Sequence, residues 1–307
     1  MSFSIIFPGQ GSQAIGMMSK LAEQHSLVKE LFIEASDVLG VDLWTMTQEG
    51  PLEALSQTEN TQPALLTAGV AAWRVWQSLG GQDPSMMAGH SLGEYTALVS
   101  AGALSFSDGV ALVRDRGRYM QEAVPAGQGA MAAIIGLEDQ VVIDVCAKTA
   151  NGDVLQAVNF NAPGQVVIAG SADAIERATV TMKEAGAKRA LPLPVSIPAH
   201  SRLMTPASER LAERIAGINI SLPTIAVLHN CNVQVAESAE QVAQNLVTQL
   251  DSPVRWVESV NAMHAQGIDQ FIESGPGKVL GGMVKRIIKG VDVACIDNPD
   301  AFENLIN

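Results

Sequence analysis

The segment Gly89-His90-Ser91-Leu92-Gly93 contains the residues best suited to covalent chemistry in this sequence. Gly-x-Ser-x-Gly is the pattern of a nucleophile elbow, a sharp strand-to-helix turn that projects a serine hydroxyl into the open. Glycines flank the turn because a side chain there would collide with the neighbouring strand or helix. A short apolar run precedes the segment and a small, apolar run follows it, as a strand and a helix would. The context favours a nucleophilic Ser91 over an ordinary glycine-rich turn.

A serine hydroxyl becomes an effective nucleophile only when a neighbouring base removes its proton. The sequence offers five histidines as candidates for that base. His200 lies between a predicted strand and a predicted helix, and it follows the serine in chain order, as elbow enzymes require. We therefore predict His200 as the base, with His229 as the second candidate. No Asp or Glu stands out as a third triad member, so a backbone carbonyl or an amide would have to orient the imidazole.

Arg116 is predicted to face inward. A helix that is opened by Ser105 and runs to about Ala123 places Leu112, Arg116 and Met120 on one face. An unpaired buried guanidinium is very costly, so this side chain needs a partner. Two partners fit the spacing equally well. One is an internal carboxylate in a structural ion pair, and the other is a carboxylate-bearing substrate held by two parallel hydrogen bonds.

A glycine-rich loop, residues 8–13, follows the first predicted strand, residues 3–7. Its glycines miss the spacing of the dinucleotide-binding motif, and it lacks the Gly-Lys-Ser/Thr ending of a phosphate-binding loop. Elbow enzymes take one oxyanion donor from the residue after the nucleophile and a second from a separate strand-to-helix loop. The N–H groups of Leu92 and Gln10 could fill these positions, although a plain tight turn explains the Gln10 loop equally well.

The remaining pattern predicts a larger α/β body with a small inserted subdomain. Between residues 127 and 193 the predicted order is strand, helix, strand, strand, helix, strand, which is the ferredoxin-like unit. The body would then comprise residues 1–126 and 194–307. Its predicted elements include helices over residues 20–39, 241–250 and 254–266, a helix that starts with Thr61 as its cap, and strands over residues 85–88, 224–229 and 270–273.

Composition excludes several classes of protein. The net charge of −13 argues against nucleic acid or an anionic membrane as the main partner, and no apolar run is long enough to span a bilayer. The first residues lack the basic region of a signal peptide. Three widely separated cysteines fit free thiols in a reducing cytoplasm and show neither metal-binding spacing nor a disulfide framework.

Eight segments together carry a resemblance to a known family: residues 7–13, 62–65, 89–95, 114–117, 161–170, 200–201, 253–256 and 275–280. In combination these segments resemble the malonyl-CoA:acyl carrier protein transacylases of bacterial fatty acid synthesis. The resemblance covers essentially the whole chain, and its specificity comes from the combination of segments.

The resemblance implies a hydrolase-like α/β body with a central, mostly parallel sheet, over which the ferredoxin-like insert closes. Ser91 would carry the acyl group, His200 would be its base, and Arg116 would hold the free carboxylate of the malonyl group. The backbone carbonyl of Gln249 would orient His200, which accounts for the missing acid.

The resemblance also assigns residues around this centre. Gln10 and Leu92 would supply the oxyanion N–H groups, and three polar residues of the insert would line the site: Asn159, Asn161 and Gln165. Carrier protein is acidic in this system, so the basic residues of the last predicted helix are candidate docking residues: Lys285, Arg286 and Lys289.

The implied activity is malonyl transfer from malonyl-CoA to acyl carrier protein through a malonyl-serine ester. Coenzyme A would enter as a substrate, and neither a metal nor an organic cofactor is expected. One alternative is a trans-acting acyltransferase that loads a polyketide or polyunsaturated fatty acid synthase. A second is a serine esterase or thioesterase, which would share Ser91 and His200 but have no use for an inward Arg116. A third is a non-enzymatic scaffold.

Overall fold

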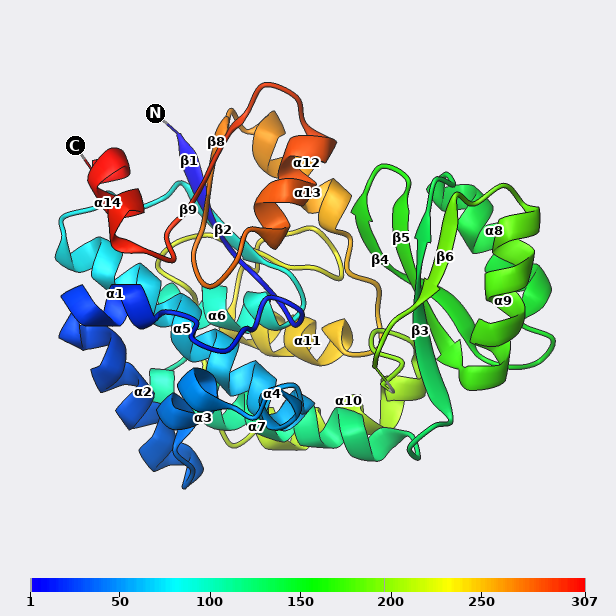
Figure 1. Ribbon diagram of the computed structural model, residues 1–307, viewed down its shortest axis with the longest axis horizontal. Helices are drawn as coiled ribbons and strands as arrows, with labels where there is room; N and C mark the ends of the chain where they lie inside the picture. Colours follow the sequence, from blue (N-terminus) through cyan, green and yellow to red (C-terminus); the bar gives the residue numbers. More distant parts are fainter. Residues whose placement is uncertain (1, 196, 307) are drawn as a thin grey trace.

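The computed structural model describes residues 2–195 and 197–306. The chain forms a larger α/β body and a smaller antiparallel unit that lies beside it (Figure 1). Both chain ends lie on the body, at the side away from the smaller unit (Figure 1).

The body is built on a five-stranded sheet in which all neighbouring strands are parallel. Its strand order is β7 (Val227–Leu228), β2 (Met86–Gly89), β1 (Phe3–Phe7), β8 (Gln270–Glu273) and β9 (Asp292–Cys295). Parallel strands with both faces covered are mostly apolar, and every residue of β1 is buried. The predicted central parallel sheet is confirmed.

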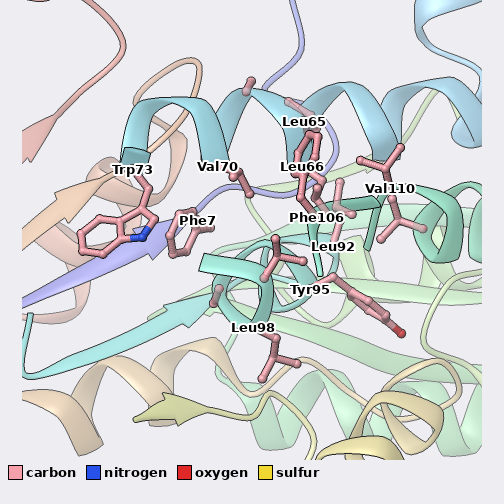
Figure 2. Packing of buried hydrophobic residues seen from close by; sticks show 14 of the residues in the cluster. Phe7, Leu65, Leu66, Val70, Trp73, Leu92, Tyr95, Leu98, Phe106 and Val110 are labelled. Atoms are coloured by element: carbon pink, nitrogen blue, oxygen red, sulfur yellow. The ribbon is translucent and has the colours of Figure 1, made fainter. Parts of the chain in front are cut away.

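Helices cover both faces of this sheet. Ile6 of β1 packs in one cluster with α12 (Trp256–Ala265) and α13 (Val279–Ile287). Its neighbours Ile5 and Phe7 belong to the cluster on the other side. There α5 (Thr58–Ser78) packs against α6 (Leu92–Ser100) and α7 (Phe106–Ala123), and Figure 2 shows Val70 and Trp73 of α5 beside Phe7.

The remaining helices complete the body. In chain order they are α1 (Ser19–Gln24), α2 (Ser26–Leu39), α3 (Leu43–Glu49), α4 (Leu52–Leu55), the short 3-10 helix η1 (Arg202–Met204), α10 (Thr205–Ile215), α11 (Ala239–Gln249) and α14 (Pro299–Ile306). Among the described residues, none of the helices is long and apolar enough to cross a membrane.

The smaller unit has the predicted ferredoxin-like order. It runs β3 (Gly129–Ile135), α8 (Asp139–Thr149), β4 (Leu155–Ala162), β5 (Gln165–Ser171), α9 (Ala172–Glu184) and β6 (Arg189–Pro192). The sheet order is β4-β5-β3-β6, and all pairs are antiparallel. Both helices pack on one face of this sheet and enclose a separate hydrophobic core. Helix α7 leads from the body into β3 (Figure 1).

The two units are joined by backbone hydrogen bonds that the sequence analysis missed. The N–H of Val254 donates to the carbonyl of Val158 at 2.8 Å, and the N–H of Phe160 donates to the carbonyl of Val254 at 3.0 Å. Because Val254 pairs with β4 in this way, the helix predicted from Val254 begins only at Trp256. The edge strand of the smaller unit is thereby fixed to the body.

Two predicted helix boundaries were wrong for reasons of tertiary packing. Helix α5 begins at Thr58, and the Thr61 hydroxyl donates to the carbonyl of Leu55 at 2.5 Å instead of capping the helix. The helix predicted over residues 20–39 is divided at His25, which has an extended backbone. The His25 ring lies 6.3 Å from the ring of Phe302 in α14, a contact with the far end of the chain that local sequence does not reveal.

Candidate active site

Ser91 occupies a strained turn between β2 and α6. Its φ of 52° and ψ of −107° lie outside the regions that L-residues favour, as a nucleophile elbow requires. The flanking glycines leave no room for a side chain. A Cβ on Gly89 would lie 1.9 Å from the backbone of Gly93, and a Cβ on Gly93 would lie 2.0 Å from the carbonyl oxygen of Phe7.

The His200 side chain contacts Ser91 just beyond the carboxyl end of β2. Its Nε2 lies 2.8 Å from Ser91 Oγ, and its Nδ1 lies 2.8 Å from the backbone carbonyl of Gln249. A carbonyl oxygen can only accept, so Nδ1 carries the proton and Nε2 is free to accept one from the serine hydroxyl. Burial, and next the charge of Arg116, lower the pKa of His200 to about 3, so the imidazole is neutral at ordinary pH.

Arg116 reaches the same point from α7 and is wholly buried. Its Nη1 donates to Gln62 Oε1 at 2.7 Å, while its Nη2 donates to Gln249 Oε1 at 3.0 Å and to Ser91 Oγ at 3.2 Å. Its guanidinium also lies 5.1 Å from the ring centre of Tyr95. In the described part of the chain, no Asp or Glu forms an ion pair with Arg116. The structural ion pair that the spacing left open is therefore not what holds this side chain.

The two predicted oxyanion donors lie on α6 and on the loop after β1. Leu92 is the first residue of α6, where a backbone N–H has no acceptor within its own helix. The loop that carries Gln10 lies against the elbow, because a Cβ on Gly9 would come within 2.6 Å of the His90 carbonyl oxygen. The side chain of Gln10 is exposed and donates to Thr58 Oγ1 at 3.4 Å.

The three predicted lining residues have different surroundings in the structure. Asn161 Oδ1 accepts a 2.7 Å hydrogen bond from His90 Nε2, beside the elbow. Asn159 is buried, and its Oδ1 has no partner among the described residues. Gln165 is not joined to this cluster, because its side chain accepts a hydrogen bond from Arg286.

The three predicted docking residues are exposed on or just after α13. Arg286 is not free for a partner, since it also donates to the carbonyl of Pro163 at 3.1 Å and so ties α13 to the β4–β5 turn. Lys289 Nζ lies 3.4 Å from the carbonyl of Lys285. His229, the second candidate base, does not contact the Ser91 hydroxyl among the described hydrogen bonds. Its Nδ1 lies 2.7 Å from Glu94 Oε1.

The sequence analysis missed three residues of this site. Gln62 holds Arg116, Asn230 accepts the N–H of Ser91 on its Oδ1 at 2.7 Å, and Glu94 lies wholly buried beneath the elbow. Asn230 follows β7, and polar residues at the carboxyl ends of parallel strands commonly form the site of an α/β protein. The position of Asn230 just after β7 was therefore the sequence feature from which it could have been predicted.

This arrangement defines a class. A strained serine, a neutral histidine and backbone donors at a helix start are the parts of an enzyme that transfers acyl groups through a serine ester. The comparisons identify the family. The acyl transferase domain family matches residues 4–296, and malonyl CoA-acyl carrier protein transacylase of Escherichia coli is 53% identical over 300 residues, covering 98% of this chain and 97% of the relative. The chain belongs to the malonyl CoA-acyl carrier protein transacylase family of acyltransferases.

Solved structures agree with this assignment. An acyl carrier protein S-malonyltransferase from Vibrio cholerae superimposes with a TM-score of 0.97 at 54% identity, covering 99% of both chains. A malonyl-transacylase solved in complex with a type II polyketide acyl-carrier protein has a TM-score of 0.98 at 50% identity, covering 100% of this chain and 99% of that one.

Proposed function

We propose that this protein transfers the malonyl group of malonyl-CoA to the pantetheine thiol of acyl carrier protein and so supplies fatty acid synthesis. The observation that carries the proposal is Arg116. This buried guanidinium lies 3.2 Å from Ser91 Oγ, and its acceptors are uncharged. A planar guanidinium at this point matches an acyl group that ends in a carboxylate. The names of the close relatives support the same substrate and carrier.

The first half-reaction forms the acyl-enzyme. Ser91 Oγ attacks the thioester carbonyl carbon while His200 Nε2 takes the hydroxyl proton. The negative charge that develops on the carbonyl oxygen is stabilised by the N–H groups of Leu92 and Gln10. The carbon–sulfur bond then breaks, His200 returns the proton to the departing thiolate, and malonyl-Ser91 and free coenzyme A result.

The second half-reaction reverses the roles. The carrier's pantetheine thiol gives its proton to His200 and attacks the ester carbonyl of malonyl-Ser91. The carbon–oxygen bond breaks, the serine recovers its proton from His200, and the malonyl thioester leaves on the carrier. Binding of a carrier protein by a relative at 50% identity supports this acceptor.

Arg116 distinguishes this activity from simple hydrolysis. A thioesterase that acts on unsubstituted acyl chains gains nothing from a buried cation beside its nucleophile, and burying that cation is costly. Holding the malonyl carboxylate fixes the acyl group and restricts how water reaches the ester. The geometry therefore favours transfer of a carboxylate-bearing acyl group over the thioesterase alternative.

The wider setting follows from the same chemistry. Neither half-reaction changes an oxidation state, and the side chains and backbone groups named above supply the acid–base and oxyanion chemistry. We therefore propose that no metal or organic cofactor takes part and that coenzyme A is a substrate. The net charge of −13 disfavours nucleic acid and anionic membranes as partners. The cysteines are unpaired, which suits work in the reducing cytoplasm.

Intact-protein mass after mixing with malonyl-CoA tests the proposal. We expect one malonyl-sized increment that disappears on addition of holo carrier protein and never forms on Ser91→Ala. Release of coenzyme A with no increment would replace the proposal with a thioesterase. No increment and no release would indicate a non-enzymatic protein.

A further inference from the structure

Glu94 is a wholly buried carboxylate directly beneath the elbow, in the first turn of α6. Its Oε1 lies 2.7 Å from His229 Nδ1. Its Oε2 accepts from the N–H of Asn230 at 2.9 Å and from Gln249 Nε2 at 2.8 Å. Burying a carboxylate is costly unless its oxygens are satisfied, and here both oxygens have partners.

The bond to Gln249 determines which way that amide faces. An amide has one donating end and one accepting end. Because Glu94 and the backbone carbonyl of Ser91 both take the Nε2 end, at 2.8 and 2.9 Å, the Oε1 end must face Arg116. The backbone carbonyl of the same Gln249 accepts from His200 Nδ1. One residue held by Glu94 thus contacts both the cation and the base.

The bond to Asn230 reaches the nucleophile. Asn230 Oδ1 accepts the N–H of Ser91 at 2.7 Å, and its Nδ2 donates to the carbonyl of Gly89 at 2.7 Å. These two bonds hold the strained backbone on both sides of the turn. Glu94 anchors the backbone of Asn230 and so supports the elbow from below.

Glu94 also supplies a buried negative charge near Arg116 without pairing with it. The Gln249 amide separates the two groups, accepting from the guanidinium and donating to the carboxylate. A direct ion pair would occupy the guanidinium edge that a substrate carboxylate needs. The intervening amide links the two groups by hydrogen bonds and leaves the guanidinium without a carboxylate bound directly to it.

We propose that Glu94 is the positioning residue of this site: through Oε2 it fixes the Gln249 amide and Asn230, and thereby places the base, the cation and the nucleophile. Glu94 touches no reacting atom itself. This inference rests on the proposed malonyl transfer, since it explains how that site selects a carboxylate-bearing acyl group.

Two substitutions distinguish the role of Glu94 as a hydrogen-bond acceptor from the role of its negative charge. Glu94→Ala removes both oxygens and leaves the Gln249 Nε2 with the Ser91 carbonyl as its remaining acceptor, so the amide is held less firmly. Glu94→Gln keeps one oxygen for Gln249 and Asn230, while its new NH₂ group can donate to His229 Nδ1 once that imidazole changes tautomer. Glu94→Gln should therefore rescue most of what Glu94→Ala loses.

The informative readout is the ratio of kcat/KM for malonyl-CoA to that for acetyl-CoA, because the fraction of folded enzyme cancels in a ratio. We expect Glu94→Ala to lower malonyl transfer by about 100-fold, because a misplacement of reacting groups by about 1 Å can cost this much, and to lower the ratio at least tenfold. Glu94→Gln should keep the ratio within about threefold of wild type.

Glu273 provides a matched control. It is also a wholly buried carboxylate that accepts two backbone N–H groups, those of Leu280 and Gly281, but no bond links it to Ser91 or Arg116. Glu273→Ala should lower the free energy of unfolding and leave the malonyl-to-acetyl ratio unchanged.

An unchanged ratio in Glu94→Ala, with losses that match the loss of folded protein, would overturn the inference. If Glu94→Ala does not fold, Gln249→Met tests the same chain of bonds, because it keeps the backbone carbonyl and removes the amide. We expect its ratio to fall at least tenfold, and an unchanged ratio would again overturn the inference. Wild-type enzyme run in parallel must form malonyl-Ser91; failure there would instead refute the proposed function.

Discussion

The floor of the site and the α13 rim differ in how their polar groups are held. By the floor we mean Ser91, Glu94, Arg116, His200 and Gln249, and all but Ser91 are at most 2% exposed. Their polar groups are joined in one hydrogen-bonded network.

By the α13 rim we mean the exposed residues Lys285, Arg286 and Lys289 with the β4–β5 turn that Arg286 contacts. There Lys285 and Lys289 are exposed, whereas Arg286 is bonded to Gln165 and to the carbonyl of Pro163. Buried, hydrogen-bonded groups resist rearrangement, whereas exposed charges adapt to a partner. From this comparison we propose that acyl chemistry and acyl selection depend on the floor, and that the exposed lysines of the rim take part in recognition of the carrier.

Removing the base should have the largest effect. His200→Ala leaves Ser91 without a proton acceptor, and such substitutions in serine enzymes cost at least about 10⁴-fold in kcat. Both half-reactions should fail together, measured as malonyl-enzyme formation and as transfer to carrier. Retained acylation would show that the floor does not act as one unit.

The pH profile should show a smaller but clear effect. A base with an ordinary pKa of about 6.5 would lose roughly 100-fold of its neutral form by pH 4.5. Burial, with Arg116, lowers the pKa of His200 to about 3, so the neutral form persists as pH falls and declines only near pH 3. We expect kcat/KM for acylation to be nearly flat from pH 8 to 4.5. A fall in kcat/KM with a midpoint near pH 6.5 would contradict the lowered pKa of His200.

Charge reversal on the rim should have the smallest effect. Lys285→Glu with Lys289→Glu removes attraction for an acidic carrier while leaving Arg286 and its contact with Pro163 in place. We expect KM for carrier protein to rise several-fold at low salt, with KM for malonyl-CoA unchanged. Equal KM values for carrier in both enzymes would remove these lysines from the docking surface.

The chemistry of the floor was predictable where it depends on local sequence. Ser91 was found because the elbow needs glycines on both sides, and the observed clashes at Gly89 and Gly93 show the same constraint. The ferredoxin-like unit was found because its strands and helices alternate within one continuous segment. Arg116 was placed on a buried face by helical spacing alone.

The network beneath the floor was not predictable in this way. Glu94 reads as an ordinary acidic residue in the first turn of a helix, and only the fold brings His229 and Gln249 to it. Val254 reads as helical until β4 is beside it. Gln165 was expected at the site, but its side chain contacts Arg286, a residue 121 positions away. Long-range contacts of this kind have no local signature.

The most direct test of acyl selection is a competition between malonyl-CoA and acetyl-CoA at equal concentration, read by intact-protein mass. We compare wild type with Arg116→Ala and with Arg118→Ala, a half-exposed arginine on the same helix. Wild type and Arg118→Ala should carry malonyl almost exclusively, whereas Arg116→Ala should lose that preference and still form acetyl-Ser91, which shows that it is folded. If Arg116→Ala still selects malonyl, the buried guanidinium is not what distinguishes the two acyl groups.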